Sequence, residues 1–172
     1  MSDASSIASW FTGRLPDEWT AAGDPAIVVD REEITVTVTI VAPEVGDDAS
    51  PVDRAEAVAG RIAAFREDTR DRRMAIAREA EHRFERKVAW AVRVGDEVAV
   101  FSHLAAPAMT RLRQPERMVL DTLVDANIAR SRSDALAWCV RLVGRNTDEW
   151  LADLRAAMRS VDDVRARGPE AD

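Results

Sequence analysis

The strongest structural constraint in this sequence is the alternation between residues 34 and 40. Isoleucine or valine occupies every even position of that segment, and threonine occupies every odd position. A period of two in residues that favour extended backbone predicts a β-strand, which we place at residues 34–41. The apolar residues 26–29 predict another strand just before it, on the other side of the charged residues 30–33.

A long helix is expected after this pair of strands. Ser50 followed by Pro51 is typical of a helix start, because serine caps the first turn and proline needs no amide partner there. Apolar residues then recur at spacings near 3.6 up to about Phe84. The middle of this helix, residues 66–73, is almost wholly charged with both signs, which predicts a kink or a solvent-exposed surface of ion pairs.

A second pair of strands is expected at residues 88–94 and 98–104, joined by a turn at Gly95. The first part of the chain therefore predicts a ββαββ unit of the α+β class, with one long helix against a sheet. Residues 1–25 are expected to be irregular, with isolated apolar anchors at Trp10, Phe11 and Trp19.

The sequence contains few residues with which to build a conventional catalytic or nucleotide site. No two of its seven glycines are closer than ten residues apart, whereas dinucleotide fingerprints and P-loops need closely spaced glycines so that backbone can approach phosphate. Glu79 and His82 have the spacing of half a di-iron site, but Val100 stands where the second half needs a carboxylate before His103. Cys139 is the only cysteine, which excludes an internal disulfide and a Cys-based zinc cluster. We therefore expect no enzymatic activity, no metal and no cofactor.

Composition favours a soluble protein without a membrane partner. Hydrophobic residues make up 47% and charged residues 32% of the 172 residues, which is ordinary for a folded domain. No apolar run is long enough to span a bilayer, and the start of the chain has no basic region followed by an apolar core, so no signal peptide is expected. These features predict a cytoplasmic location.

The second half of the chain predicts a strand followed by helices. A short strand is expected to end at residue 112 or 113, and a helix follows at about residues 115–126. Ser131 caps the next helix, and Asp134 can return a hydrogen bond to the cap, as in a capping box with aspartate in place of glutamate. Gly144 is expected to end this second helix.

A third helix is expected to start at Thr147. Its apolar residues recur at spacings of 3, 4 and 3, at Leu151, Leu154, Met158 and Val161. This stripe favours packing on the preceding helices, with a short coiled coil as the alternative. Residues 166–172 are expected to be frayed.

Three short motifs mark the strand and the first two of these helices. They are Arg111-Leu112, Leu120-Asp121-x-Leu123 and the helix-opening segment Ser131-Arg132-Ser133-Asp134-Ala135-Leu136. In this order they resemble the ribbon-helix-helix family of DNA-binding proteins, over about residues 107–145. The family usually places a proline directly after the strand, whereas Arg113-Gln114 precede Pro115 here.

The resemblance implies an intertwined homodimer, whose paired strands form a ribbon that enters the major groove of double-stranded DNA. With Leu112 facing inward, Met109, Arg111 and Arg113 would point outward. The two arginines are then candidates for bidentate contacts to guanine O6 and N7. The first backbone amides of the second helix are candidates for holding a phosphate, beside Ser131, Arg132 and Ser133.

Charge is divided unevenly along the chain. Residues 1–50 contain two arginines and ten acidic residues, whereas residues 107–145 contain seven arginines and four acidic residues. The formal net charge of −7 therefore does not describe the segment that resembles a DNA-binding unit. We predict an α+β unit at residues 1–105 that binds a ligand or a protein partner, a ribbon-helix-helix-like unit at 106–145, and a terminal helix with a tail at 146–172.

The sequence thus favours a homodimeric, cytoplasmic DNA-binding protein that acts as a transcriptional regulator. The alternative is a non-enzymatic adaptor or assembly protein that uses the same helices only to dimerise or to form a larger assembly. Lys87 is the only lysine among 24 basic residues, a bias typical of GC-rich coding that makes any one arginine a weak sign of DNA recognition. A small-molecule-binding role for the first unit is a third hypothesis, for which the sequence nominates no residue.

Overall fold

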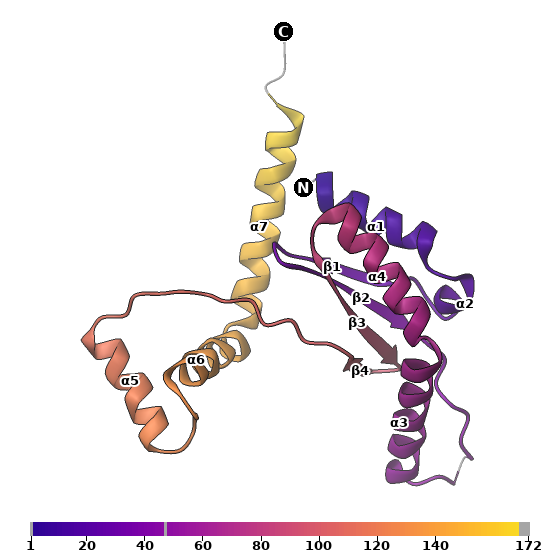
Figure 1. The fold of residues 1–172 in the computed structure, drawn as a ribbon, viewed down its shortest axis with the longest axis horizontal. Coiled ribbons are helices and arrows are strands. Elements are labelled where there is room, and N and C mark those ends of the chain that lie inside the picture. The colour runs from indigo at the N-terminus through magenta and orange to yellow at the C-terminus, as the bar shows by residue number, and fades with distance from the viewer. Residues whose placement is uncertain (1, 47, 169–172) are drawn as a thin grey trace. The chain divides into compact units, whose positions relative to one another are not determined.

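The structure, a computed structural model, describes residues 2–46 and 48–168. The chain divides into two compact units, Met1–Pro107 and Ala108–Asp172. Within the described residues the fold contains seven helices and one four-stranded sheet (Figure 1), which confirms the predicted α+β class. No helix in this described part of the chain is long and apolar enough to cross a membrane.

The sheet of the first unit has the strand order β1-β2-β3-β4. Its strands are β1 (Ala26–Val29), β2 (Glu33–Thr39), β3 (Lys87–Val94) and β4 (Glu97–Val100). The central pair β2–β3 is parallel and the two outer pairs are antiparallel, so the predicted ββαββ order is confirmed. The fourth strand ends earlier than predicted because the Trp90 amide donates to Ser102 Oγ (3.4 Å) rather than to a backbone carbonyl.

The predicted long helix is present as two helices, α3 (Pro51–Asp68) and α4 (Arg70–Phe84). Ser50 and Asp53 form a capping box at the start of α3. The break falls at Thr69, inside the charged segment where a kink was expected. There the Thr69 hydroxyl donates to the Phe65 carbonyl and accepts a hydrogen bond from Arg73 Nε (2.9 Å).

The prediction that residues 1–25 are irregular is wrong. They contain α1 (Ser2–Arg14) and the short α2 (Asp17–Thr20). Ile7, Phe11 and Leu15 recur every four residues and are buried together, so tertiary packing supports a helix whose serines and glycine give it little intrinsic propensity.

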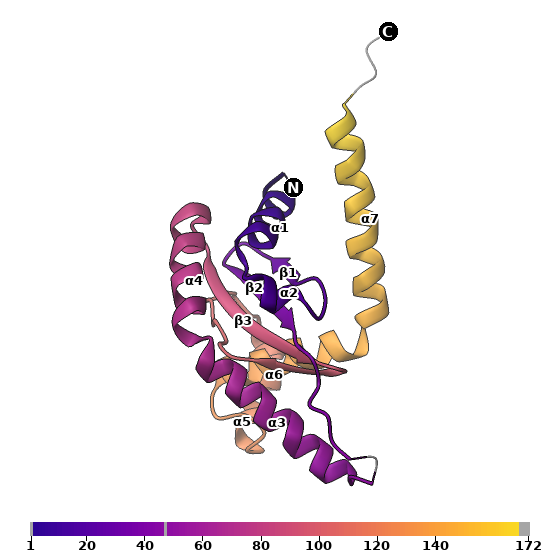
Figure 2. The ribbon, with the colours of Figure 1, turned by 90° about the vertical axis from the view of Figure 1, so that its right-hand side faces the viewer.

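Helices α1, α2 and α4 pack against the same face of the sheet (Figures 1 and 2). Trp90 lies at the centre of this core, with the rings of Phe11 and Trp19 edge-on at 6.4 and 6.0 Å. The buried members of the core are Ile7, Phe11, Leu15, Trp19, Ile34, Val36, Val38, Ile76, Ala80 and Trp90. The threonines of β2 therefore lie on the opposite face, as alternation along a strand requires.

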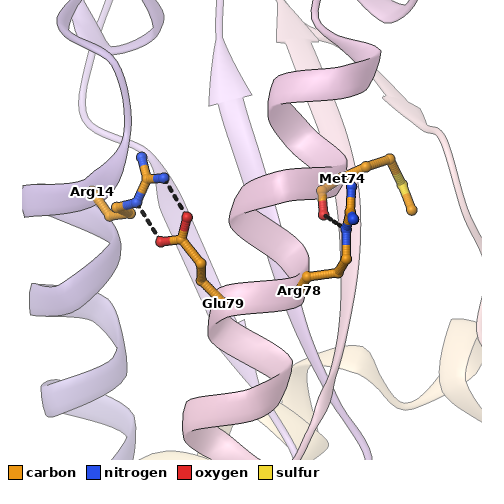
Figure 3. A network of polar contacts seen from close by, with 4 residues as sticks. All are labelled: Arg14, Met74, Arg78 and Glu79. Atoms are coloured by element: carbon orange, nitrogen blue, oxygen red, sulfur yellow. Dashed lines mark hydrogen bonds and ion pairs between the residues drawn. The ribbon is translucent and has the colours of Figure 1, made fainter.

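An ion pair joins α1 to α4 beside this core (Figure 3). Arg14 Nε and Nη2 donate to the two carboxylate oxygens of Glu79 at 2.7 and 2.6 Å. The hydrogen bonds from Arg14 lower the pKa of the Glu79 carboxyl. Arg78, the preceding residue, donates within its own helix to the Met74 carbonyl, so of the four residues drawn only Arg14 and Glu79 make a contact between α1 and α4.

The second unit contains α5 (Gln114–Asp125), α6 (Arg132–Asn146) and α7 (Asp148–Arg167). The three predicted helices are confirmed, but the prediction that Gly144 ends the second one is wrong. The helix continues to Asn146, where side chains of Asn146 and Thr147 donate to the carbonyls of Leu142 and Val143. The tail predicted to fray is helical up to Arg167, and residues 169–172 lie outside the described residues.

The buried position of Phe11 predicts that α1 is an integral part of the core. Phe11→Ala is expected to lower the free energy of unfolding by roughly 3–5 kcal/mol, because it removes a fully buried aromatic ring. Thr12→Ala, one position along on the exposed side of α1, is the control and should change it by less than about 0.5 kcal/mol. Urea denaturation of the full chain measures both values, and equal effects would show that α1 is not part of the core.

Candidate nucleic-acid interface

The strand expected before α5 is not a paired strand in the single chain. Residues 102–113 have no regular secondary structure. A physical reason is that a ribbon strand of the predicted kind pairs with the same strand of a second copy, which one chain does not supply. The prediction of a strand within one chain is therefore wrong, and the pairing that the resemblance implies stays a prediction.

Side chains in this segment nevertheless separate into inward and outward groups. Leu112 is half-buried and packs against the buried cluster of Leu120, Ala129 and Ala135. Arg111 and Arg113 on either side of it are exposed, and Met109 is completely exposed. Arg117 of α5 fixes the end of the segment, because its Nη1 donates to the Leu112 carbonyl at 2.7 Å.

Ser131 caps α6 as its sequence indicates. Its hydroxyl oxygen accepts a hydrogen bond from the Asp134 amide at 3.2 Å. The return bond differs from the prediction, since the Asp134 carboxylate accepts from the Arg130 amide at 3.0 Å, one residue before the cap. That backbone hydrogen bond is the largest cause of the lowered pKa of Asp134.

Arg132 pairs with an acidic residue of the neighbouring helix. Its Nε and Nη2 donate to the two oxygens of Asp121 at 2.6 and 2.7 Å. These hydrogen bonds lower the pKa of Asp121 and raise that of Arg132. Two of the three guanidinium nitrogens of Arg132 are thus held by α5, and its backbone amide lies in the first turn of α6. The sequence did not predict that Asp121 pairs with Arg132. The two residues are eleven positions apart, so no local pattern links them.

A shallow depression brings part of the predicted site together. Its lining includes Met109 from the extended segment and Arg132 and Ser133 from the start of α6. Arg111, Arg113 and Ser131 are not part of that lining. The structure therefore places the outward-pointing arginines and the helix start in the same unit, with Met109 next to the helix start.

The second unit leaves much of its apolar surface uncovered. Its buried cluster consists of Leu120, Ala129 and Ala135. On α6, the neighbouring residues Val140 and Val143 are 65% and 55% exposed. Exposed patches of large apolar side chains are normally covered by another molecule.

The apolar stripe of α7 is also largely uncovered. Leu151 is half-buried, but Leu154, Met158 and Val161 are exposed. The expectation that this stripe packs on the preceding helices of the same chain is therefore wrong. Helix α7 extends away from α6 (Figure 1), which leaves its stripe exposed.

These features define a two-part α+β protein, with a compact sheet unit followed by a helical unit. The chain matches the family model described as Rv1265-like protein, N-terminal domain, at residues 5–100, and the Mb1296 C-terminal domain at residues 113–165. It belongs to this Rv1265-like family. The C-terminal model is not described as ribbon-helix-helix, so that resemblance is not confirmed.

Two relatives are similar over nearly the whole chain. They are the uncharacterized proteins Rv1265 of Mycobacterium tuberculosis and Mb1296 of Mycobacterium bovis. Each is 57% identical over 168 residues, which covers 98% of this chain and 72% of the relative. No solved structure matches the chain significantly.

The Asp121–Arg132 pair predicts how the second unit responds to acid. Because the folded-state pKa of Asp121 is lowered, its stabilising contribution is present above the ordinary carboxyl pKa and is lost as pH falls through the lowered value. Between about pH 6 and about pH 2.5, wild-type protein should therefore lose more stability than Asp121→Asn. Urea denaturation followed by circular dichroism at both pH values measures the difference.

Asp125→Asn is the matched control, since Asp125 lies exposed at the end of the same helix. It should show the same loss of stability in acid as the wild type. A loss in Asp121→Asn as large as in wild type would contradict the role of this pair.

Proposed function

We propose that this protein is a homodimeric, cytoplasmic DNA-binding protein, and that it acts as a transcriptional regulator. The observation that carries the proposal is the arrangement at residues 109–113. Leu112 packs on the helical core, while Arg111 and Arg113 are exposed on a backbone that has no strand partner among the described residues. Two such segments, paired antiparallel, would form a two-stranded ribbon with four arginines for the major groove.

A second copy would also cover the apolar surface of the helical unit. One copy fully buries only a few apolar residues of this unit among those described, which is a small core for an independently stable domain. Pairing of the ribbon would bring the exposed Val140 and Val143 of two copies within reach of a shared interface. The family resemblance implies the same intertwined arrangement.

The start of α6 supplies the phosphate contact in this proposal. Ser131 fixes the first turn through its cap, which leaves the following amides, including those of Arg132 and Ser133, directed from a helix N-terminus. Asp121 and Asp134 lie close to this turn, so the contact would position the protein without contributing most of the affinity. Base contacts by Arg111 and Arg113 would give the sequence specificity.

The distribution of charge along the chain is consistent with DNA contacts by the second unit alone. Residues 107–145, which contain the proposed ribbon, α5 and most of α6, hold more arginines than acidic residues, whereas the first fifty residues hold far more acidic residues than arginines. The acidic first unit would repel DNA phosphates and so limit nonspecific association.

DNA binding is tested by fluorescence anisotropy with labelled fragments of the organism's own genomic DNA across a salt series. We expect a specific fragment to bind at about 10⁻⁸ M or tighter, with affinity that falls steeply as salt rises. Arg111→Ala/Arg113→Ala should weaken binding at least about tenfold, since each bidentate contact to guanine contributes about 1–3 kcal/mol.

Arg155→Ala/Arg159→Ala is the control for this experiment. It removes the same charge from exposed positions on α7, outside the proposed ribbon. It should bind a specific fragment like wild type. Flat anisotropy of a verified dimer at low salt, or equal losses in the two double variants, would reject the DNA-binding proposal.

The exposed stripe of α7 favours a second candidate function. An adaptor or assembly protein would use the helical unit only for association between copies, and its stripe would join copies into a dimer or a larger assembly. This alternative shares the dimer with the first proposal but needs no DNA.

Dimerisation is tested separately by analytical ultracentrifugation. Wild-type protein should sediment at a mass of at least twice the 19.0 kDa of one chain. Val140→Glu should weaken self-association at least about tenfold, because it would bury an unpaired carboxylate in the interface. Arg145→Gln changes the charge by the same amount at an exposed position on the other side of α6, five residues from Val140, and should remain dimeric. A monomeric wild type would contradict both candidate functions.

A further inference from the structure

A groove of about 860 Å³ lies in the first unit between the helices α3 and α4 and the strands β3 and β4. Its helix side includes Ile62, Arg66, Arg70 and Met74, and its strand side includes Trp90, Ala99 and Phe101. A volume of this size falls in the range of small-molecule pockets in proteins. The groove lies entirely within residues that form one unit.

Arg73 is the unusual residue of this groove. It is only 6% exposed, yet it makes no ion pair with a carboxylate among residues 2–46 and 48–168. Its Nε donates to Thr69 Oγ1 and its Nη2 to the Arg66 carbonyl, at 2.9 and 2.6 Å. Its guanidinium carbon also lies 4.7 Å from the centre of the Phe101 ring. A guanidinium removed from water without an opposite charge is energetically costly.

The charges nearest to Arg73 have the same sign. Burial is the largest cause of its lowered pKa, followed by repulsion from Arg66 and Arg70. Glutamates also line the groove. Glu67 and Glu97 are exposed, and Glu81 is bound to Lys87 Nζ at 3.0 Å and accepts from the Val88 amide. Three arginines and three glutamates therefore line the groove, and its positive charge is concentrated at Arg66, Arg70 and Arg73, in a unit whose N-terminal fifty residues are strongly acidic.

Apart from Ser102, the remaining lining of the groove is apolar. Ile62 and Met74 come from the helices, and Phe101 lies half-buried just after β4. Alanines at positions 59, 63, 77 and 99 leave space beside them. Trp90, which also lines the groove, has a buried indole N–H without an acceptor.

We propose that this groove binds an amphipathic anion, a small molecule with a carboxylate or similar acidic group on an apolar body. The acidic group would neutralise Arg73 together with Arg66 and Arg70, and the apolar body would lie against Phe101, Ile62 and Met74. The proposal rests on the first unit alone, so it does not depend on DNA binding by the second.

The test uses two dyes with the same apolar rings. Anilinonaphthalene sulfonate carries an anionic group, and N-phenylnaphthylamine is its uncharged counterpart. Fluorescence titration of the full chain should show saturable binding of the anionic dye, at least about tenfold tighter than the neutral one. Dodecanoate should displace the anionic dye, whereas the same concentration of inorganic phosphate should not, because phosphate lacks the apolar body.

Arg66→Gln/Arg70→Gln is the diagnostic variant, since both side chains are exposed and their loss leaves the buried Arg73 in place. It should bind the anionic dye at least about tenfold more weakly, with binding of the neutral dye unchanged. Arg31→Gln/Arg93→Gln removes the same charge from exposed positions outside the groove and should behave like wild type. Equal binding of the two dyes, displacement by phosphate as effective as by dodecanoate, or equal losses in the two variants would overturn the proposal.

Discussion

Burial of a single face of the sheet organises the first unit. The alternating residues of β2 and the aromatic ring of Trp90 form an apolar surface that three helices cover, and the ion pair between Arg14 and Glu79 joins two of these helices. Because α3 and α4 meet at Thr69 beside the edge of this surface, Arg73 is buried next to Phe101 and lines the proposed anion groove. The packing of the core and the position of the groove thus have the same origin.

In the second unit, by contrast, a single copy leaves much of the apolar surface exposed. Val140, Met158 and their neighbours stay exposed, and residues 109–113 have backbone groups without a strand partner. A second copy that pairs with the first would cover these apolar side chains and would supply a strand partner for residues 109–113. The proposed DNA contacts by Arg111 and Arg113 depend on that pairing, because only a paired ribbon presents them as a fixed set.

Much of the fold was predictable because its signals are local. The threonine alternation of β2 gave a strand, and the serine caps at Ser50 and Ser131 gave two helix starts. The helix α1 escaped prediction because its stability comes from contacts of Phe11 with distant residues. For the same reason, the pairing of Arg132 with Asp121 and the burial of Arg73 could not be predicted, since each depends on packing between helices. The prediction that α6 ends at Gly144 failed because the helix continues past it. The side chains of Asn146 and Thr147 then donate hydrogen bonds to carbonyls of the last turn.

Hydrogen–deuterium exchange of the backbone amides at residues 109–113 tests the central claim most directly. The measurement is made on the full chain at a concentration where ultracentrifugation shows a dimer, with residues 103–107 as the internal reference for unpaired backbone. A ribbon paired between two copies predicts slow exchange at 109–113, and loss of that protection in Val140→Glu. Exchange at 109–113 as fast as in the reference segment of a dimeric protein would contradict the ribbon and leave an assembly role without a DNA-reading surface.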